Sequence, residues 1–339
     1  MTVFDVHAHV YPRVTRAESR ILAGAGEPWL RVHGDGTGMM MSGGTEYRPV
    51  TEALWEPEHR LAELDALGVH RQAVSSTPLM FGYGAGPAAA AEWCELVNAR
   101  ILDHCSGSGG RLLPLCQVPL QDTRLACETV SKARAAGHRG VHIGNHLGER
   151  PLSDGGLTEF LAHCAAEDMP VLVHPWDMQG DARQDRYMLR WLTGMAAETQ
   201  LTILDLALSG AFERLPDSLR LCFCHGGGSF AYLLGRADNA WRRRDIVRAD
   251  SPKPPSAYTD RFFVDSAVFD PRALRLLVDV MGVERVMLGT DFPFPLGEQD
   301  PGAVVRDCPT LTEADRARIL GANAESFFAP NGTGESRHR

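Results

Sequence analysis

The amino-acid sequence predicts an α/β fold, a (β/α)₈ TIM barrel with a small insertion after the first strand. Three observations support this fold class. Short apolar runs rich in β-branched residues alternate with longer segments in which apolar residues recur at helical spacing. The alternation repeats eight times, the number of strand and helix units that closes this kind of barrel. A length of 339 residues also suits a barrel, which is longer than most single domains.

Each predicted strand is an apolar run that ends at a polar residue, a glycine or a turn. In chain order the strands are Val3–His7, Val69–Ser76, Leu112–Val118, Gly140–Ile143, Pro170–His174, Leu219–His225, Phe262–Asp265 and Val286–Asp291. The helices have apolar residues three or four positions apart, as in Glu56–Leu67, which closes at Gly68. The others are Ala88–Cys105, Leu125–Ala136, Leu157–Glu167, Glu198–Ser209, Ser229–Arg248, Pro271–Met281 and Glu313–Leu320.

The domain organisation is predicted to be one barrel over residues 1–328, with an insertion at about residues 11–55. The insertion is rich in Gly, Met and Pro and has weak periodicity, which indicates loops with a small β element. A long segment of this kind inside a compact domain is usually functional or disordered. Residues 329–339 are polar, and we expect a disordered tail there.

Composition excludes several classes of protein. The net charge of −9 argues against a nucleic-acid-binding surface, which needs a basic stripe to neutralise phosphates. No apolar run approaches the roughly 18 residues that span a bilayer, and the N-terminus passes into a strand without a signal-peptide pattern. The eight cysteines include no Cys-x-x-Cys pair, so we expect reduced core residues. We therefore predict a cytoplasmic protein that binds neither nucleic acid nor membrane.

Two histidines end the first predicted strand. His7 and His9 are two positions apart, and alternate residues of a strand project to the same face, so both imidazoles can reach one metal ion. Barrel chemistry lies at the carboxyl ends of the strands, where the sequence also places His174, His225 and Asp291. Any one of these residues alone is weak support, but together they predict a site.

Three imidazoles and one carboxylate suit Zn²⁺ and are tolerated by other first-row metals. We assign His7, His9, His174 and Asp291 as the ligands of one ion. His225 then remains free to act as an acid or base, taking a proton from water whose pKa the ion has lowered. A fifth ligand or a hydrogen-bond partner is the alternative role for His225. A two-metal site would need a modified lysine at the fourth strand end, and the chain's two lysines lie elsewhere.

Other readings of the motifs are discounted. The triglycine Gly226-Gly227-Gly228 resembles a lipase oxyanion loop, but the chain has no Gly-x-Ser-x-Gly turn. The triglycine is therefore interpreted as a place where backbone approaches the ligand or the next helix closely. Cys222 and Cys224 alternate with Phe223 and His225, so we expect the two cysteines to face away from His225 and pack beneath helices.

Two arginines predict an acidic small molecule as substrate, because the planar guanidinium pairs with carboxylates. Arg48 lies beside Pro49 in the insertion, in a predicted loop above the barrel mouth, and Arg236 follows His225 on the next helix. The aromatic residues at strand ends are Trp176, Phe292 and Phe294. They can pack against a flat conjugated ligand or serve as core or lid packing, and both interpretations stay open.

Several motifs together resemble the amidohydrolase superfamily, and within it the decarboxylating branch. They are His-x-His at His7 to His9, His-Pro-Trp-Asp at His174 to Asp177, Cys-His-Gly-Gly-Gly-Ser-Phe at Cys224 to Phe230 and Gly-Thr-Asp-Phe-Pro at Gly289 to Pro293. The likeness covers nearly the whole chain. Its strand-end histidines are shared by many relatives, whereas the Arg48 segment and the segment from Ser229 to Arg236 are more specific.

The resemblance implies a zinc-dependent decarboxylase with one Zn²⁺ per subunit, no organic cofactor and a small dicarboxylate semialdehyde as substrate. It carries metal ligation to the four residues assigned above, the acid/base role to His225 and carboxylate binding to Arg48 and Arg236. It also implies a homodimer in which Arg236 reaches the neighbouring subunit's site. Whether water adds to the substrate or the substrate coordinates the metal directly stays open.

Two alternatives compete with this prediction. One is a hydrolase or hydratase on the same barrel, such as a lactonase or an unsaturated-acid hydratase. The other is a non-catalytic protein that binds a metabolite, which the free His225 beside a full set of ligands disfavours.

Overall fold

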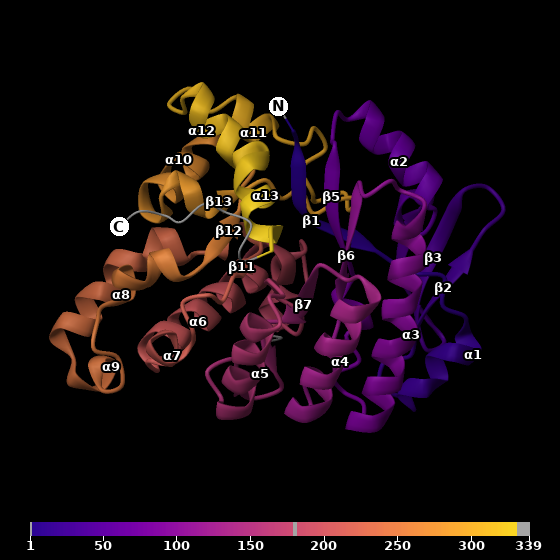
Figure 1. Ribbon diagram of the computed structural model, residues 1–339, viewed down its shortest axis with the longest axis horizontal. Coiled ribbons are helices and arrows are strands. Elements are labelled where there is room, and N and C mark those ends of the chain that lie inside the picture. The colour runs from indigo at the N-terminus through magenta and orange to yellow at the C-terminus, as the bar shows by residue number, and fades with distance from the viewer. Residues whose placement is uncertain (1, 179–181, 331–339) are drawn as a thin grey trace.

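The computed structural model describes residues 2–178 and 182–330. Eight parallel strands form one sheet in the order β1-β5-β6-β7-β10-β11-β12-β13. Their bounds are Phe4–Val10, Arg71–Ser76, Leu112–Cys116, Gly140–Gly144, Val171–His174, Leu221–Phe223, Phe263–Asp265 and Val286–Met287. The last strand returns to the first, because Val6 N donates to Leu288 O at 2.8 Å and His9 N donates to Phe292 O at 2.8 Å. The predicted barrel is confirmed (Figure 1).

Helices surround the strands on the outside of the barrel (Figure 1). Their bounds are α1 Arg16–Ser19, α2 Pro57–Ala66, α3 Pro87–Ser106, α4 Thr123–Ala136, α5 Gly155–Ala166, α6 Met195–Leu208, α7 Ala211–Arg214, α8 Phe230–Arg243, α9 Asp245–Arg248, α10 Pro271–Met281, α11 Ala303–Arg306, α12 Glu313–Ala317 and α13 Asn323–Phe328. The predicted helix Ser229–Arg248 is two helices, because Arg244 takes extended backbone angles (φ −132°, ψ 114°) between α8 and α9. Within the described residues, no helix is both long and apolar enough to cross a membrane.

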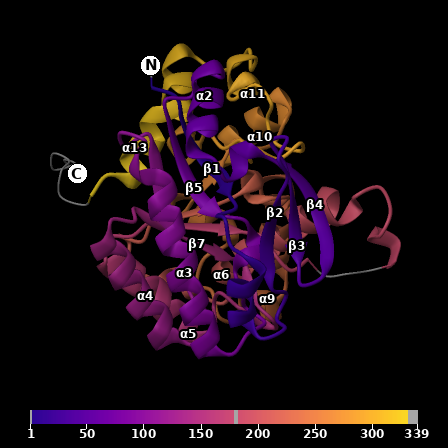
Figure 2. The same cartoon turned by 90° about the vertical axis from the view of Figure 1, so that its right-hand side faces the viewer.

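The insertion is more regular than predicted. It forms an antiparallel sheet of β2 (Pro28–Val32), β3 (Thr37–Ser42) and β4 (Thr45–Thr51), seen together beside the barrel in Figure 2. Arg48 therefore lies on a strand, paired with Met40, and the predicted loop around it is wrong. Pro49 fits because β4 is an edge strand, where a missing N–H costs no ladder hydrogen bond. A two-stranded hairpin of β8 (His146–Leu147) and β9 (Arg150–Pro151) follows β7.

The barrel interior below the site is apolar. Phe4, Leu115, Leu172 and Met287 pack there in one buried cluster together with Cys222. The alternate residues of β11, such as Phe223, pack in the other large cluster with the surrounding helices. Cys222 therefore points into the barrel, and the prediction that it lies beneath helices is wrong. The prediction is also wrong for Cys224, whose Sγ lies beside His7 and Asp265 inside the barrel. Of the predicted tail at residues 329–339, residues 331–339 lie outside the part of the chain that the structure describes.

Candidate metal centre

The four predicted ligands converge at the carboxyl end of the barrel. His7 and His9 lie on β1, His174 ends β10 and Asp291 follows β13, and ligand atoms from all four lie within 4.8 Å of one another. The three imidazole ring centroids are 5.1 to 5.2 Å apart. Asp291 Oδ1 is 3.2 Å from His9 Nε2 and 3.6 Å from His7 Nε2. The β1–β5 pairing shifts register between Asp5 and Ala8, and such irregularities commonly redirect side chains.

Each of the three imidazoles has an acceptor beside its Nδ1 atom. The acceptors are the Asp265 carboxylate for His7 (2.7 Å), the Ser76 carbonyl for His9 (3.4 Å) and the Pro175 carbonyl for His174 (2.6 Å). These contacts favour the tautomer with a proton on Nδ1, which leaves the Nε2 lone pair free for a metal ion. Nε2 of His7 and of His174 is buried with no hydrogen-bond partner among the described residues. A divalent ion fits this donor set, because it would satisfy both orphaned atoms.

The protonation states of three of the four residues also suit a ligand set. Although burial opposes this, Cys224 and Asp265 raise the pKa of His7 well above its ordinary value, so His7 must give up a proton to bind an ion. Burial lowers the pKa of His9, and burial together with the neighbouring imidazoles lowers the pKa of His174 well below its ordinary value. Although burial alone would raise it, contacts with His9 and His7 lower the pKa of Asp291 below its usual range. The site therefore offers neutral imidazoles at His9 and His174 and an ionised carboxylate near pH 7, the forms that bind metals.

His225 faces this cluster from the end of β11. Its ring centroid is 4.9 Å from those of His7 and His174, and its Nε2 is buried with no hydrogen-bond partner among the described residues. Burial and the nearby His7 lower the pKa of His225 to about 4, so it is neutral near pH 7 and can accept a proton. The structure thus brings all five predicted strand-end residues close to one another.

Backbone conformation explains how His225 reaches the site. Cys224 Sγ lies close to His7 and Asp265 inside the barrel, so Cys224 points inward and strict alternation would turn His225 outward. His225 instead takes a left-handed φ of 56°, which ends the alternation and turns the chain. In the triglycine that follows, a Cβ at Gly228 would lie 2.2 Å from the Ala196 carbonyl oxygen. The backbone therefore comes close to a helix, but this is the preceding helix α6 and not the next helix, which was predicted.

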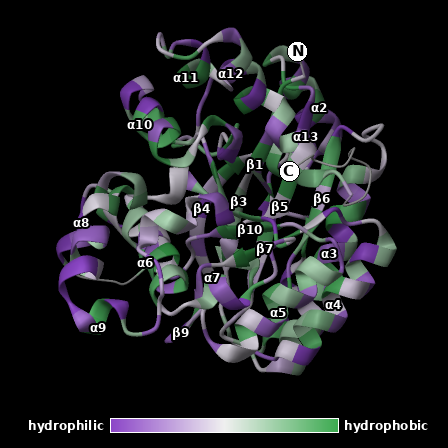
Figure 3. Ribbon diagram, turned by 60° about the vertical axis from the view of Figure 1, so that its left-hand side comes forward, coloured by the Kyte–Doolittle hydropathy of each residue, from purple (hydrophilic) through white to green (hydrophobic). Residues whose placement is uncertain are grey.

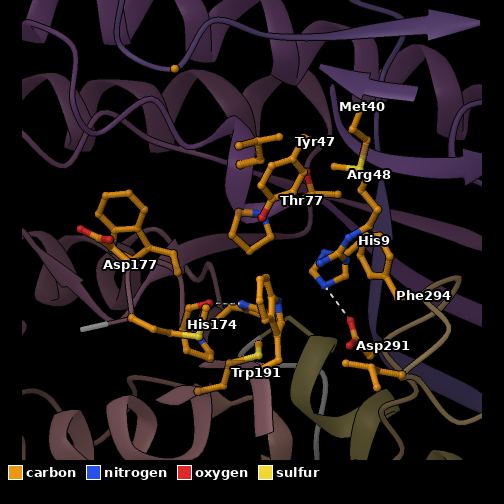
Figure 4. A pocket seen from close by; sticks show the side chains of 18 of the residues that line it. His9, Met40, Tyr47, Arg48, Thr77, His174, Asp177, Trp191, Asp291 and Phe294 are labelled. Atoms are coloured by element: carbon orange, nitrogen blue, oxygen red, sulfur yellow. Dashed lines mark hydrogen bonds and ion pairs between the residues drawn. The ribbon is translucent and has the colours of Figure 1, made fainter. Parts of the chain in front are cut away.

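A cavity of about 730 Å³ opens above the cluster, with His9, His174 and Asp291 in its lining (Figure 4). Arg48 also lines the cavity, and its guanidinium carbon lies 4.9 Å from the Phe294 ring centroid and 5.9 Å from that of Trp191. Cation–π contacts of this kind hold a guanidinium in place without neutralising it. Arg48 thus offers its positive charge to an anionic group in the cavity.

The other predicted substrate residues differ in whether they line the cavity. Trp176 and Phe294 line the cavity, whereas Phe292 packs with Ala8 and does not line it. Arg236 is exposed on α8 and is not among the cavity-lining residues. Within the described chain, one of the two predicted arginines therefore lies at the site.

Two residues near the cluster were missed from the sequence. Asp265 ends β12 and contacts His7, and it could have been found by the strand-end rule that identified the histidines. His142 lies on β7 with its ring 5.8 Å from His9 and 5.7 Å from His174. It stands inside its strand rather than at the end, so that rule gives no signal for it.

Comparison with known proteins gives consistent similarities. The amidohydrolase family model matches residues 4–329. The chain is 35% identical to "2-amino-3-carboxymuconate-6-semialdehyde decarboxylase" of Dictyostelium discoideum, covering 96% of this chain and 90% of the relative. It is 30% identical to the protein of the same name from Caenorhabditis elegans, covering 94% and 92% of the two chains. The fold resembles the apo crystal structure of Metarhizium anisopliae IDCase, with a TM-score of 0.83, 21% identity and coverage of 96% and 97%.

Proposed function

The chain belongs to the amidohydrolase family, and from this premise we propose that it is a metal-dependent decarboxylase of 2-amino-3-carboxymuconate 6-semialdehyde. The products would be 2-aminomuconate 6-semialdehyde and CO₂, in the catabolism of tryptophan through 3-hydroxyanthranilate. The observation that carries the proposal is the convergence of His7, His9, His174 and Asp291 at a cavity that also presents Arg48. Two relatives at 30 to 35% identity that cover nearly the full chain support this substrate.

The metal is proposed to be one Zn²⁺ ion held by the three Nε2 atoms and the Asp291 carboxylate. Mixed nitrogen and oxygen donors suit zinc and also other first-row divalent ions, so the ion is chosen by availability as well as by the site. When bound, such an ion supplies a Lewis acid that can polarise a substrate oxygen or lower the pKa of a water molecule.

The chain's own residues would carry the remaining steps. Arg48 holds a substrate carboxylate, and the aromatic rings of Trp191 and Phe294 keep the conjugated substrate away from bulk water. Neutral His225 takes up one proton from solvent. As the C–C bond to the departing carboxylate breaks, its electron pair enters the conjugated enamine-aldehyde system. The imidazolium of His225 then gives its proton to that carbon, so that CO₂ leaves and hydrogen takes its place.

We further propose a homodimer in which Arg236 completes the substrate site of the neighbouring subunit. Large apolar side chains are exposed on neighbouring helices, with Tyr232 on α8 79% exposed and Leu201 on α6 57% exposed. Figure 3 shows α6, α8 and α9 on the same side of the molecule. Exposed large side chains of this kind support a self-association surface, and Arg236 is exposed on the same helix as Tyr232.

Subunit mixing tests the dimer directly. His225→Ala and Arg236→Ala proteins should each be inactive alone, and a mixed dimer should regain one working site, formed by the intact His225 of one chain and the intact Arg236 of the other. If Arg236 acted within its own chain, no mixed site would be complete. Activity that stays absent after mixing, with mixed dimers verified by tags, would contradict the proposal.

Product analysis tests the reaction. Metal-replete protein incubated with the semialdehyde should release CO₂ while the near-ultraviolet absorbance of the substrate falls, and His225→Ala protein is the matched control. A hydratase would raise the mass of the product by one water and release no CO₂, whereas a lactonase would open lactones instead. A metal-loaded protein that leaves every conjugated acid unchanged would favour a metabolite-binding role.

A further inference from the structure

The buried carboxylate of Asp265 joins the metal ligands to the turn that carries His225. Asp265 ends β12 and is fully buried (0% exposed). One oxygen, Oδ2, lies 2.7 Å from His7 Nδ1 and accepts from the backbone N–H of His225 at 3.0 Å. The other, Oδ1, accepts from the backbone N–H of Gly226 at 2.8 Å and of Ala267 at 3.1 Å. The carboxylate thus bonds β1, the turn after β11 and its own strand end.

Three of the four groups that contact the Asp265 carboxylate are backbone N–H donors. The fourth is the imidazole of His7, and the carboxylate determines which nitrogen of that ring carries the proton. Because an ionised carboxylate can only accept, His7 must carry its proton on Nδ1 to bond Oδ2. The Nε2 lone pair of His7 then faces the other ligands, where Asp291 Oδ1 is 3.6 Å away. A carboxylate behind an imidazole ligand orients the ring and raises its basicity.

We propose that Asp265 is a positioning residue that sets the tautomer of His7 and fixes the backbone of the His225 turn. One side chain would then position both the metal ligand His7 and the acid/base residue His225. This inference rests on the proposed metal site, because the tautomer of His7 matters only if His7 binds the ion. The left-handed φ of 56° at His225 adds to the case, since two N–H bonds to Asp265 hold that turn in a sparsely populated conformation.

The segment that follows β13 packs closely against Asp265 and His7. A Cβ added at Gly289 would lie 2.6 Å from the Asp265 Cβ and 2.9 Å from the His7 Cβ. A glycine at this position therefore lets the chain after β13 come close to both side chains. Cys224 Sγ also lies within 4.8 Å of ligand atoms of His7 and Asp265. A second ion held there would require His7 to bridge two metals through both nitrogens, which its bond to Asp265 opposes.

The test uses Asp265→Asn, because an amide cannot reproduce four acceptor contacts. Either orientation of the amide points its NH₂ group at a donor, at Gly226 and Ala267 or at His7 and His225. We expect the affinity for Zn²⁺ and Co²⁺ to fall about 10- to 100-fold. With the site saturated, kcat should still fall and KM should change little, since Asp265 does not line the cavity. The d–d absorption of bound Co²⁺ should also change.

The matched control is Asp168→Asn. Asp168 precedes β10 at the opposite end of the barrel, pairs with Arg220 at 2.5 Å and has a left-handed φ of 57° that asparagine tolerates. This variant should keep wild-type metal affinity, Co²⁺ spectrum and kcat.

A measurement on the wild-type protein keeps the proposal testable if Asp265→Asn does not fold. In ¹⁵N-histidine-labelled, zinc-loaded protein, long-range ¹H–¹⁵N spectra should show His7 with its proton on Nδ1. A proton on Nε2 of His7 would overturn the proposal. So would an Asp265→Asn protein that matches wild type in metal affinity, Co²⁺ spectrum and kcat, or two ions per wild-type chain with one at Asp265. A wild-type chain that binds no ion would instead refute the metal site itself.

Discussion

The fully buried Arg60 of α2 gives a prediction of stability that can be worked from its contacts. Its guanidinium donates to the Ala53 carbonyl at 3.0 Å, to Gln72 Oε1 at 2.5 Å and to the His9 carbonyl. Its carbon also lies 5.0 Å from the Phe292 ring centroid. Arg60→Met keeps much of the side-chain volume but removes every donor, so three buried acceptors lose a partner. Because the His9 carbonyl is one of them, the change acts just behind the metal ligands.

The expected cost follows from those lost bonds. Each unsatisfied buried acceptor costs about 1–3 kcal/mol, and removing one member of a buried charge network typically costs about 3–5 kcal/mol in total. The second figure applies because Gln72 links Arg60 to the buried Asp5 carboxylate through a 2.8 Å hydrogen bond. We therefore expect the free energy of unfolding of Arg60→Met protein to fall by about 3–5 kcal/mol.

Urea unfolding of the metal-free protein, followed by circular dichroism, measures this change. Arg124→Met is the control, because Arg124 is 68% exposed and its ion pair within the described residues is with Glu128 on its own helix. That variant should change the free energy of unfolding by less than about 0.5 kcal/mol. An Arg60→Met protein within about 1 kcal/mol of wild type would refute the reasoning, since that is below the typical cost of breaking a buried network.

Three further predictions concern activity and pH. His225→Ala should keep its bound metal but lose turnover by about 10²- to 10⁴-fold, and activity within about tenfold of wild type would exclude the acid/base role. Arg48→Lys keeps the charge but loses the planar fork, so KM for the dicarboxylate should rise by about tenfold or more in steady-state assays; an unchanged KM would place the substrate carboxylate elsewhere. Burial lowers the pKa of His104 to about 3 and of His138 to about 4, so these imidazoles stay neutral in the folded state while the unfolded chain takes up protons below about pH 6.5. Stability is therefore lost as pH falls, by up to about 1.4 kcal/mol per pH unit for each group, and a free energy of unfolding that is flat from pH 7 to pH 5 would contradict this.

Most of the barrel could be predicted from the sequence, because the patterns that indicate its strands and helices are local. Apolar runs and helical periodicity are properties of a few consecutive residues, and strand ends meet at one face of the barrel whatever the loops do. His7, His9, His174, His225 and Asp291 were found in this way, and the structure brings all five together.

What the sequence could not supply depends on backbone conformation or on distant pairing. The orientation of Cys224 was inferred from the alternation of side-chain directions along a strand, which the left-handed φ of His225 breaks. No pattern of residues in the sequence predicts this φ. The sheet of β2, β3 and β4 has little polar and apolar alternation, so its strands become evident only when they pair. His142 stands inside β7 and not at a strand end, so its place beside His9, with 5.8 Å between the ring centroids, becomes evident only in the folded chain.

Zinc titration of metal-free protein, with CO₂ release from the semialdehyde as the readout, tests the central claim most directly. The proposed site predicts that the rate rises in proportion to added Zn²⁺, reaches a plateau at one ion per chain, and stays at background in His174→Ala protein, whose Nε2 donor is removed. Undiminished CO₂ release by the metal-free protein would contradict the claim, as would a chain that binds one ion at these four residues and releases no CO₂.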